Sequence, residues 1–361
     1  MNICTSLQPD QHYFAGYADR RLGDTERKRF FAEIIMKKRR ILAALAAVIF
    51  LLTFSSYAAE EEQDHIKWVD FTLTAPLLKT AAEIDIETYG KERHVDWIEL
   101  LACLAARCGG EFEKTSSKDA QRLADRYLSG ESFEEMANNR KLFDYYKEAY
   151  AAALGGLLSA YTESMLHSDG TTSETVKYGI CASGPLAAGY TYSHFDDFGL
   201  SRDYGYKRRH LGHDMMGSVG TPVTAMESGY VEVCGWNQYG GWRVGIRSFD
   251  GKRYYYYAHL RRGHPYCDLY EGKIVTAGEV IGYLGMTGYS AKEDVNNISI
   301  PHLHFGLELI FAPEQKDGWN QIWIDVYELV KFLEPYRVSA VKCDDGDYRS
   351  TVQRIPVDFW E

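Results

Sequence analysis

The chain has no excess of positive charge: its 361 residues hold 40 Lys and Arg against 51 Asp and Glu, a net charge of -11. A protein that binds nucleic acid by neutralising phosphates needs a basic surface, so this balance argues against a nucleic-acid partner. Paired cysteine spacings are missing as well, because the seven cysteines are scattered without a zinc-finger or disulfide pattern. Cys103 and Cys108 are the closest pair, and we expect them to pack in a core.

Long hydrophobic runs are scarce too, and the one that stands out lies near the N-terminus. A basic cluster precedes the uncharged apolar run Ile41 to Phe54, and small residues follow at Ser56 and Ala58. These are the three parts of a secretory signal peptide, and the apolar stretch is also near the lower length limit of a membrane span. We therefore expect residues 36–59 to be a signal peptide or an N-terminal membrane anchor, with the rest of the chain extracytoplasmic.

Residues 1–35 do not fit ahead of a signal peptide, because Met36 directly precedes the basic cluster and would be a better start. We interpret them as an upstream extension of the reading frame or as a short cytoplasmic tail. The length of the remaining chain favours two domains.

Residues 60–166 show helical periodicity and are predicted to form a small all-α domain. An apolar stripe over about 95–107 ends at a Gly-Gly pair, a second helix is expected at about 117–128, and Ser132 begins a capping-box pattern. A long helix is predicted from about Lys141 to Met165. No residues here have a spacing typical of a chemical site, so we interpret the region as a targeting, substrate-presenting or packing module that could take a cell-envelope protein as partner.

The composition then changes to Gly, Ser and Thr, and residues 167–195 are predicted to be a linker with the first strands. Short strands with glycine-containing turns follow, and Asp250-Gly251 is a strong hairpin signal between two of them. Residues 311–361 are predicted to be a C-terminal extension with one helix, at about 319–333.

The stretch from Pro301 to Leu309 alternates polar and apolar residues with a period of two, as in a strand with one buried face. His302, His304 and Glu308 share the polar face. Two imidazoles are an unusual choice for a merely solvated face, so we expect them to bind something.

A second candidate group lies upstream, where His210 and Asp214 are four residues apart and fall on the same side of the backbone. Imidazole nitrogen and carboxylate oxygen are ordinary zinc ligands, and a third histidine would complete a site with one coordination position left for water. His213 has the opposite parity in a strand, so we interpret it as a supporting or structural residue.

Several motifs occur in order over about residues 196–310: His210-x-x-x-Asp214, Gly220-Thr221-Pro222-Val223, Gly229-x-Val231, Tyr257-Ala258-His259-Leu260, Gly278-x-x-Ile281-Gly282, Gly285-x-Thr287-Gly288 and His302-Leu303-His304-Phe305. This succession resembles the M23, or LytM-type and lysostaphin-like, zinc metallopeptidases. The resemblance implies a mainly β peptidase domain of compact antiparallel strands, whose groove holds one Zn2+ ion. It also implies hydrolysis of peptide bonds in the stem or cross-bridge of bacterial peptidoglycan, in cell-wall remodelling, division or sporulation.

Matched to the family, His210, Asp214 and His304 correspond to the zinc ligands, while His259 and His302 correspond to the two non-ligand histidines of the site. The latter pair would act on the water and on the developing oxyanion, and the sequence leaves open which does which. The loop between Gly288 and His302 is longer than is usual in the family, which puts the substrate preference in doubt.

The resemblance implies a protein that faces the cell wall of a bacterium, either secreted or anchored at the cell membrane. Its expected partners are peptidoglycan peptides, with a membrane contact only through residues 36–59 if these are not cleaved. The alternative is a catalytically inactive M23-fold scaffold or cell-wall-binding protein. All five site positions hold chemically competent residues, which favours the enzyme.

Overall fold

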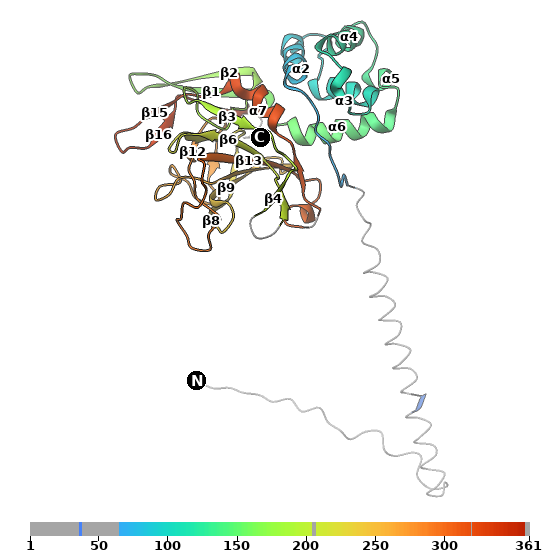
Figure 1. The fold of residues 1–361 in the computed structure, drawn as a ribbon. Helices are drawn as coiled ribbons and strands as arrows, with labels where there is room; N and C mark the ends of the chain where they lie inside the picture. The colour runs from blue at the N-terminus through green and yellow to red at the C-terminus, as the bar shows by residue number, and fades with distance from the viewer. Residues whose placement is uncertain (1–35, 38–64, 204–206, 319, 358–361) are drawn as a thin grey trace, which may run out of the picture. The chain divides into compact units, whose positions relative to one another are not determined.

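The computed structural model describes residues 36–37, 65–203, 207–318 and 320–357, and Figure 1 shows its helices and strands. His65–Glu361 forms one compact unit. The segments predicted at 1–35 and 36–59 lie outside the described residues, apart from Met36 and Lys37. Within the part of the chain that is described, no helix has the length and apolar character needed to cross a membrane.

Helices come before the first strand, as the periodicity predicted: α2 (Ala75–Thr88), α3 (Trp97–Cys108), α4 (Ser117–Leu128), α5 (Phe133–Met136) and α6 (Arg140–Leu154). Their predicted ends are confirmed where a capping signal exists. Gly109 ends α3 in the left-handed conformation, with φ 68°. Ser132 starts α5 with the expected capping box, in which the side chain of Glu135 is the second member.

The helix predicted to run to Met165 is wrong in its second half. α6 ends at Leu154, and the strand β1 (Leu158–Leu166) follows after Gly155 and Gly156. β1 lies between β2 and β17 in a three-stranded antiparallel sheet. A short apolar run such as the one near Leu158 fits a helix or a buried strand equally well, and pairing with distant strands decides between them.

The strand β2 (Thr172–Ile180) lies in the region that was predicted to be a linker with the first strands. Residues 172–177 of this strand are exposed, which explains a polar, threonine-containing composition that resembles a loop. The third strand of this small sheet, β17 (Val352–Pro356), comes from the C-terminal extension.

The main sheet has the antiparallel β architecture that the sequence predicted. Its strand order is β11-β8-β9-β10-β13-β6-β3, with β14 also paired to β13. These strands are β3 (Tyr192–Phe195), β6 (His213–Gly217), β8 (Gly229–Asn237), β9 (Gly241–Ser248), β10 (Arg253–Ala258), β11 (Ile274–Val275), β13 (His302–Leu309) and β14 (Ile322–Ile324). The hairpin predicted across Asp250-Gly251 joins β9 to β10.

Smaller elements complete the described fold. They are the hairpin strands β4 (Ser201–Asp203) and β5 (Lys207–Arg209), the paired strands β7 (Pro222–Thr224) and β12 (Val280–Tyr283), the paired strands β15 (Ala340–Lys342) and β16 (Tyr348–Ser350), and the helix α7 (Tyr327–Leu333). The C-terminal helix predicted from about residue 319 is therefore shorter, because β14 occupies the first part of that stretch.

The central strand β13 has the two faces that its alternation predicted. Leu303, Phe305, Leu307 and Leu309 have no exposed surface and form part of the core. The opposite face of the strand holds His302, His304 and Glu308. The period of two therefore directs one row of side chains into the core and the other towards the candidate site.

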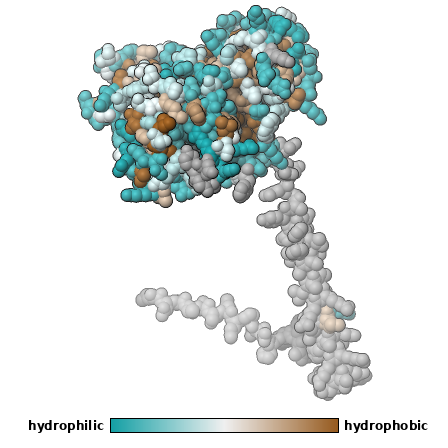
Figure 2. All heavy atoms as spheres, viewed as in Figure 1, coloured by the Kyte–Doolittle hydropathy of each residue, from teal (hydrophilic) through white to brown (hydrophobic). Residues whose placement is uncertain are grey.

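Buried polar contacts join the helices to the sheets. The Arg253 guanidinium, on β10, donates to the carbonyl oxygen of Ala152 at the end of α6 (2.7 Å) and to Glu227 (2.7 Å). The Tyr178 hydroxyl on β2 donates to Asp85 on α2 at 2.7 Å. The face shown in Figure 2 is mostly hydrophilic, with apolar residues scattered singly or in small groups.

Candidate metal centre and active site

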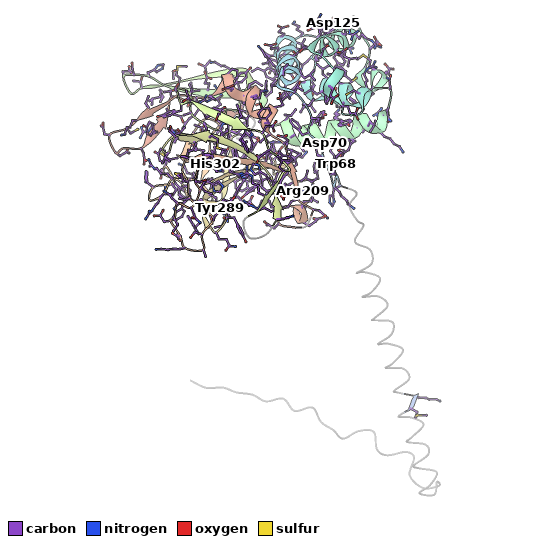
Figure 3. All side chains as sticks on the ribbon, viewed as in Figure 1. Trp68, Asp70, Asp125, Arg209, Tyr289 and His302 are labelled. Carbon is purple, nitrogen blue, oxygen red and sulfur yellow. The ribbon has the colours of Figure 1, made fainter. Side chains whose placement is uncertain are left out.

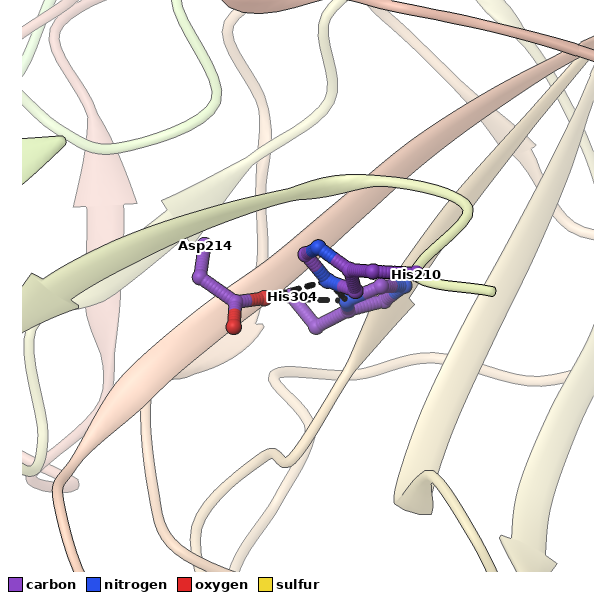
Figure 4. A group of neighbouring side chains, drawn as sticks. All are labelled: His210, Asp214 and His304. Carbon is purple, nitrogen blue, oxygen red and sulfur yellow. Dashed lines mark hydrogen bonds and ion pairs between the residues drawn. The ribbon is translucent and has the colours of Figure 1, made fainter. Parts of the chain in front are cut away.

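Three of the predicted site residues come together in one cluster (Figure 4). His210 precedes β6, Asp214 lies in β6, and His304 lies opposite Asp214 in the neighbouring strand β13. One ligand atom from each lies within 4.8 Å of the others. His210 Nε2 is 2.9 Å from His304 Nδ1 and 3.1 Å from Asp214 Oδ1, and His304 Nδ1 is 3.0 Å from the same oxygen.

The chemistry of this donor set fits a zinc ion. Two imidazole nitrogens and one carboxylate oxygen converge, and these are the atoms that bind zinc in catalytic sites with an open coordination position. Burial would raise the pKa of Asp214, but its contacts with the His210 and His304 rings outweigh burial and hold that pKa well below its usual range. Asp214 is therefore an ionised ligand, as a metal site requires.

Asp197 and Arg202 support the cluster, and the sequence analysis did not identify either of them. Asp197 Oδ1 lies 2.7 Å from His210 Nδ1. Arg202 donates through Nη2 to Asp214 Oδ2 at 2.7 Å and through Nε to Asp197 Oδ2 at 3.1 Å. The Asp197 carboxylate beside Nδ1 favours a proton on that nitrogen and so a lone pair on His210 Nε2, which faces the cluster. The guanidinium occupies Asp214 Oδ2 and leaves Oδ1 for the cluster.

His259 and His302 lie beside the cluster, with their ring centroids 4.8 Å apart. His259 Nδ1 donates to the carbonyl oxygen of Thr287, and His302 Nδ1 donates to that of Ile300, each at 2.8 Å. Both rings are thus held in the tautomer whose Nε2 carries the lone pair. Burial lowers the pKa of His259 well below its usual value, which keeps this imidazole neutral. Its backbone is also strained, at φ 61°.

His213 lies outside the cluster, as its parity predicted. Its Nε2 is 2.8 Å from His194 Nδ1, and its ring packs against Tyr327 of α7. Burial lowers the pKa of His213 to about 3, so it is a neutral core histidine. The residue therefore has a packing role.

Two cavities flank the cluster along the sheet. The first, here called the His302 pocket, measures about 560 Å³. Its polar border is formed by His302, Asp214, Arg202, Asp197, Asn297 and Ser299, and its other side chains are Phe195, Met216, Tyr289, Ile298 and Ile300. The second, here called the His304 pocket, measures about 470 Å³ and is bordered by His210, His304 and Glu308 together with Arg208, Arg209, Arg243, Tyr254, Tyr256, Lys316, Asp317 and Trp323. Figure 3 labels Tyr289, His302 and Arg209 on this part of the molecule. The metal cluster thus lies between a largely apolar cavity and a largely basic one.

Comparisons with known proteins agree with this geometry. A family model described as Peptidase family M23 matches residues 208–316. The chain is 35% identical over 159 residues to the L-Ala–D-Glu endopeptidase of Bacillus subtilis (strain 168), which covers 44% of this chain and 45% of that protein. It is 38% identical over 97 residues to lysostaphin of Staphylococcus simulans, which covers 27% of this chain and 17% of that protein. The chain therefore spans less than half the length of these relatives.

Among solved structures, the crystal structure of a lytM protein from Ruminococcus gnavus ATCC 29149 superposes with a TM-score of 0.50 at 24% sequence identity. The superposition covers 74% of this chain and 92% of that chain, so the shared fold extends well beyond residues 208–316.

Proposed function

Because residues 208–316 of this chain belong to peptidase family M23, we propose that the protein is a zinc-dependent endopeptidase that hydrolyses peptide bonds in the stem peptides or cross-bridges of bacterial peptidoglycan. The observation that carries the proposal is the convergence of His210, Asp214 and His304 between two cavities that can receive a chain on either side. One relative is named an L-Ala–D-Glu endopeptidase, and this name supports a peptide bond of a stem peptide as the target. A protein with this activity works outside the cytoplasm, either secreted or anchored, and faces the cell wall.

The residues that would hold zinc are His210 through Nε2, Asp214 through Oδ1 and His304 through Nδ1. When bound there, the ion supplies a Lewis acid for the scissile carbonyl and lowers the pKa of water. The Asp197 carboxylate and the Arg202 guanidinium keep two of these ligand atoms in place before the ion arrives.

His259 and His302 move the protons. Each has its Nδ1 proton committed to a backbone carbonyl, so each Nε2 can accept the proton of the attacking water. The imidazolium formed in this way can return the proton to the leaving amine or donate a hydrogen bond to the oxyanion. The two rings are close enough for one to take each role.

Mass spectrometry of muropeptides tests the proposal. Purified peptidoglycan is incubated with the zinc-loaded protein, with and without a chelator, and with the variants His259→Ala and His264→Ala. New peptide termini should appear with the wild-type protein and disappear with the chelator. His259→Ala should bind zinc with unchanged stoichiometry and lose about a hundredfold or more in turnover, because it acts on the proton and not on the metal.

His264→Ala is the matched control, since this histidine is 54% exposed and pairs with Asp347 away from the cluster. It should cleave like the wild-type protein. Zinc-loaded protein that binds peptidoglycan without releasing any fragment would favour the non-catalytic scaffold. Unchanged turnover in His259→Ala would remove that residue from the mechanism.

A further inference from the structure

The His304 pocket holds a guanidinium for which the described part of the chain offers no hydrogen-bond or ion-pair partner. Arg243, on β9, lines the pocket, and its Nε is buried without a hydrogen-bond acceptor. Among the described residues, no carboxylate forms an ion pair with Arg243, whereas the nearby Arg247 is paired with Glu232 at 2.7 Å. An Arg side chain that is half-buried and lacks an anion is unusual, because the interior favours paired charges.

The sheet register places Arg243 beside the metal cluster. Val244 lies opposite Tyr257, and Ala258 lies opposite His304, so Arg243 continues the row that contains Ala258 and His304. Arg243 and His304 are two strands apart on the same face, a separation of roughly 10 Å between their backbones. A side chain as long as Arg can therefore reach a group only one residue away from the bond held at the metal.

Glu308, which also lines the pocket, can donate a hydrogen bond. Glu308 has no exposed surface, and neither of its carboxyl oxygens has a partner among the described residues. Burial raises the pKa of Glu308 to about 8, so at neutral pH its carboxyl is mostly protonated and carries an O–H. The other acid of the pocket, Asp317, has a side chain that is 89% exposed and lies 3.4 Å from Lys316.

We propose that the His304 pocket is a carboxylate subsite, in which the Arg243 guanidinium binds a carboxylate on the substrate residue next to the scissile bond. This inference rests on the proposed function and names its substrate class: a stem peptide with an acidic residue on one side of the bond. Two parallel N–H groups of a guanidinium can donate to the two oxygens of one carboxylate. Partial burial strengthens this ion pair. A glycine bridge has no carboxylate beside its peptide bonds and would leave Arg243 unpaired.

The His302 pocket accounts for the other side of the bond. Its lining includes the apolar side chains of Phe195, Met216 and Ile298 as well as polar ones, so it can receive an apolar residue such as alanine. A peptide that lies across the sheet from one pocket to the other therefore has an apolar residue on one side of the metal and an acidic one on the other. An alanyl–γ-D-glutamyl bond, with the free α-carboxylate of the glutamate, meets both requirements.

The test compares two synthetic stem peptides that differ at one group, the α-carboxyl of the D-glutamyl residue, which is either free or converted to the carboxamide. Wild-type protein should cleave the free acid with a kcat/KM on the order of tenfold to a hundredfold higher, the range expected for hydrogen bonds to a charged group. Arg243→Gln should lose this preference, so that its kcat/KM values for the two peptides become equal. Arg243→Lys should keep part of the preference, because the charge remains and the fork is lost.

Arg349→Gln is the matched control, because it removes the same charge from an exposed position on β16, outside both pockets. It should keep the full preference. Circular dichroism and thermal unfolding of each variant establish that the fold is retained, and the Arg243→Lys variant serves if Arg243→Gln does not fold.

Failure of the subsite and failure of the proposed function give different results. Equal cleavage of both peptides by the wild-type protein overturns the subsite and leaves the endopeptidase standing. Cleavage of neither peptide, nor of purified peptidoglycan, overturns the endopeptidase. In that case, equilibrium binding of both peptides to chelator-treated protein tests the carboxylate subsite separately. Tighter binding of the free acid that is lost in Arg243→Gln supports the subsite. Equal binding of the two peptides overturns it.

Discussion

Asp197 and Arg202 are the single residues that would order the candidate metal site before a metal binds. Asp197 is 7% exposed and lies 2.7 Å from His210 Nδ1, so this ring can present only Nε2 to the cluster. Arg202 bridges the carboxylates of Asp197 and Asp214. Without these contacts, His210 could turn or exchange its tautomer, and the ligand set would have to be ordered at the moment of binding.

We expect Asp197→Ala to weaken zinc binding by about tenfold to a hundredfold, the effect typical of losing a carboxylate that orients a histidine ligand. A chelator competition titration measures the dissociation constant directly, without reference to activity. Asp196→Ala is the matched control. The Asp196 side chain is exposed, so this substitution should leave the dissociation constant unchanged. Equal zinc affinity in the wild-type protein and both variants would contradict the role assigned to Asp197.

Glu308 should make the stability of the protein depend on pH in an unusual direction. Its pKa rises from an ordinary 4.5 to about 8 on folding, because burial disfavours the charged form. Between these two values the unfolded chain releases a proton that the folded protein keeps, so stability falls as pH rises and the loss is complete above about pH 8. Below pH 4.5, Glu308 is protonated in both the folded and the unfolded state, so it does not lower the stability there.

Glu308→Gln should remove this dependence, because the amide does not titrate. The free energy of unfolding of the variant relative to the wild type should therefore increase by roughly 2–4 kcal/mol between pH 4.5 and pH 8.5. Urea unfolding at the two pH values measures it. A difference that is the same at both values would mean that Glu308 is ionised in the folded protein.

At the scale of elements, the junction between α6 and β1 joins the helices to the sheets. A Cβ atom at Gly156 would lie 1.7 Å from Glu227 Oε1, so the chain can pass this point only without a side chain. Glu227 in turn accepts hydrogen bonds from Arg253 and from the Tyr255 hydroxyl, and Arg253 donates to the last carbonyls of α6. The end of the helix is thus held by a cation, which the helix dipole favours.

Arg253→Met should destabilise the protein by about 3–5 kcal/mol, because it leaves the Glu227 carboxylate buried without its partner. The double variant Arg253→Met with Glu227→Leu should recover a large part of this loss, since no charge then remains buried. Thermal and urea unfolding of the single and double variants complete the cycle. A single variant within about 1 kcal/mol of the wild type would show that this pair does not hold the junction.

At the scale of the whole molecule, the candidate zinc ligands come from a loop and two strands that meet only in the folded protein. His210 and His304 are separated by 94 residues, yet their ring nitrogens lie 2.9 Å apart. An ion that binds this arrangement and not the unfolded chain must stabilise the fold.

Zinc at a thousandfold excess over its dissociation constant should therefore stabilise the protein by about 4 kcal/mol, and a chelator should remove the gain. Differential scanning calorimetry of the protein with zinc and with chelator measures the shift in Tm. Asp214→Asn, which removes the anionic ligand, should show a much smaller shift. The same Tm with zinc and with chelator in the wild-type protein would contradict the ligand set.

Local patterns were sufficient for much of the fold. The alternation over residues 301–309 predicted β13 and its two faces, and the Asp250-Gly251 turn predicted the β9–β10 hairpin, because each signal depends on neighbours in the chain. β1 was missed, since a strand held mainly by its partners leaves little local signal. Its partners include β17, almost 200 residues away, so long-range pairing is needed to reveal it.

By itself the sequence determined the β-rich fold, the shared side of His210 and Asp214 and the different side of His213, because spacing and parity decide which side chains share a face. That His304 joins His210 and Asp214 was expected only from the resemblance to the M23 family. Only the tertiary structure brought in Asp197 and Arg202 around the metal ligands, and Arg243 and Glu308 in the neighbouring pocket. These residues have no characteristic spacing, and they meet because strand register and core packing place distant segments side by side. The position of a ligand on its own strand is a local property, whereas the groups that orient it or recognise the substrate depend on contacts across the sheet.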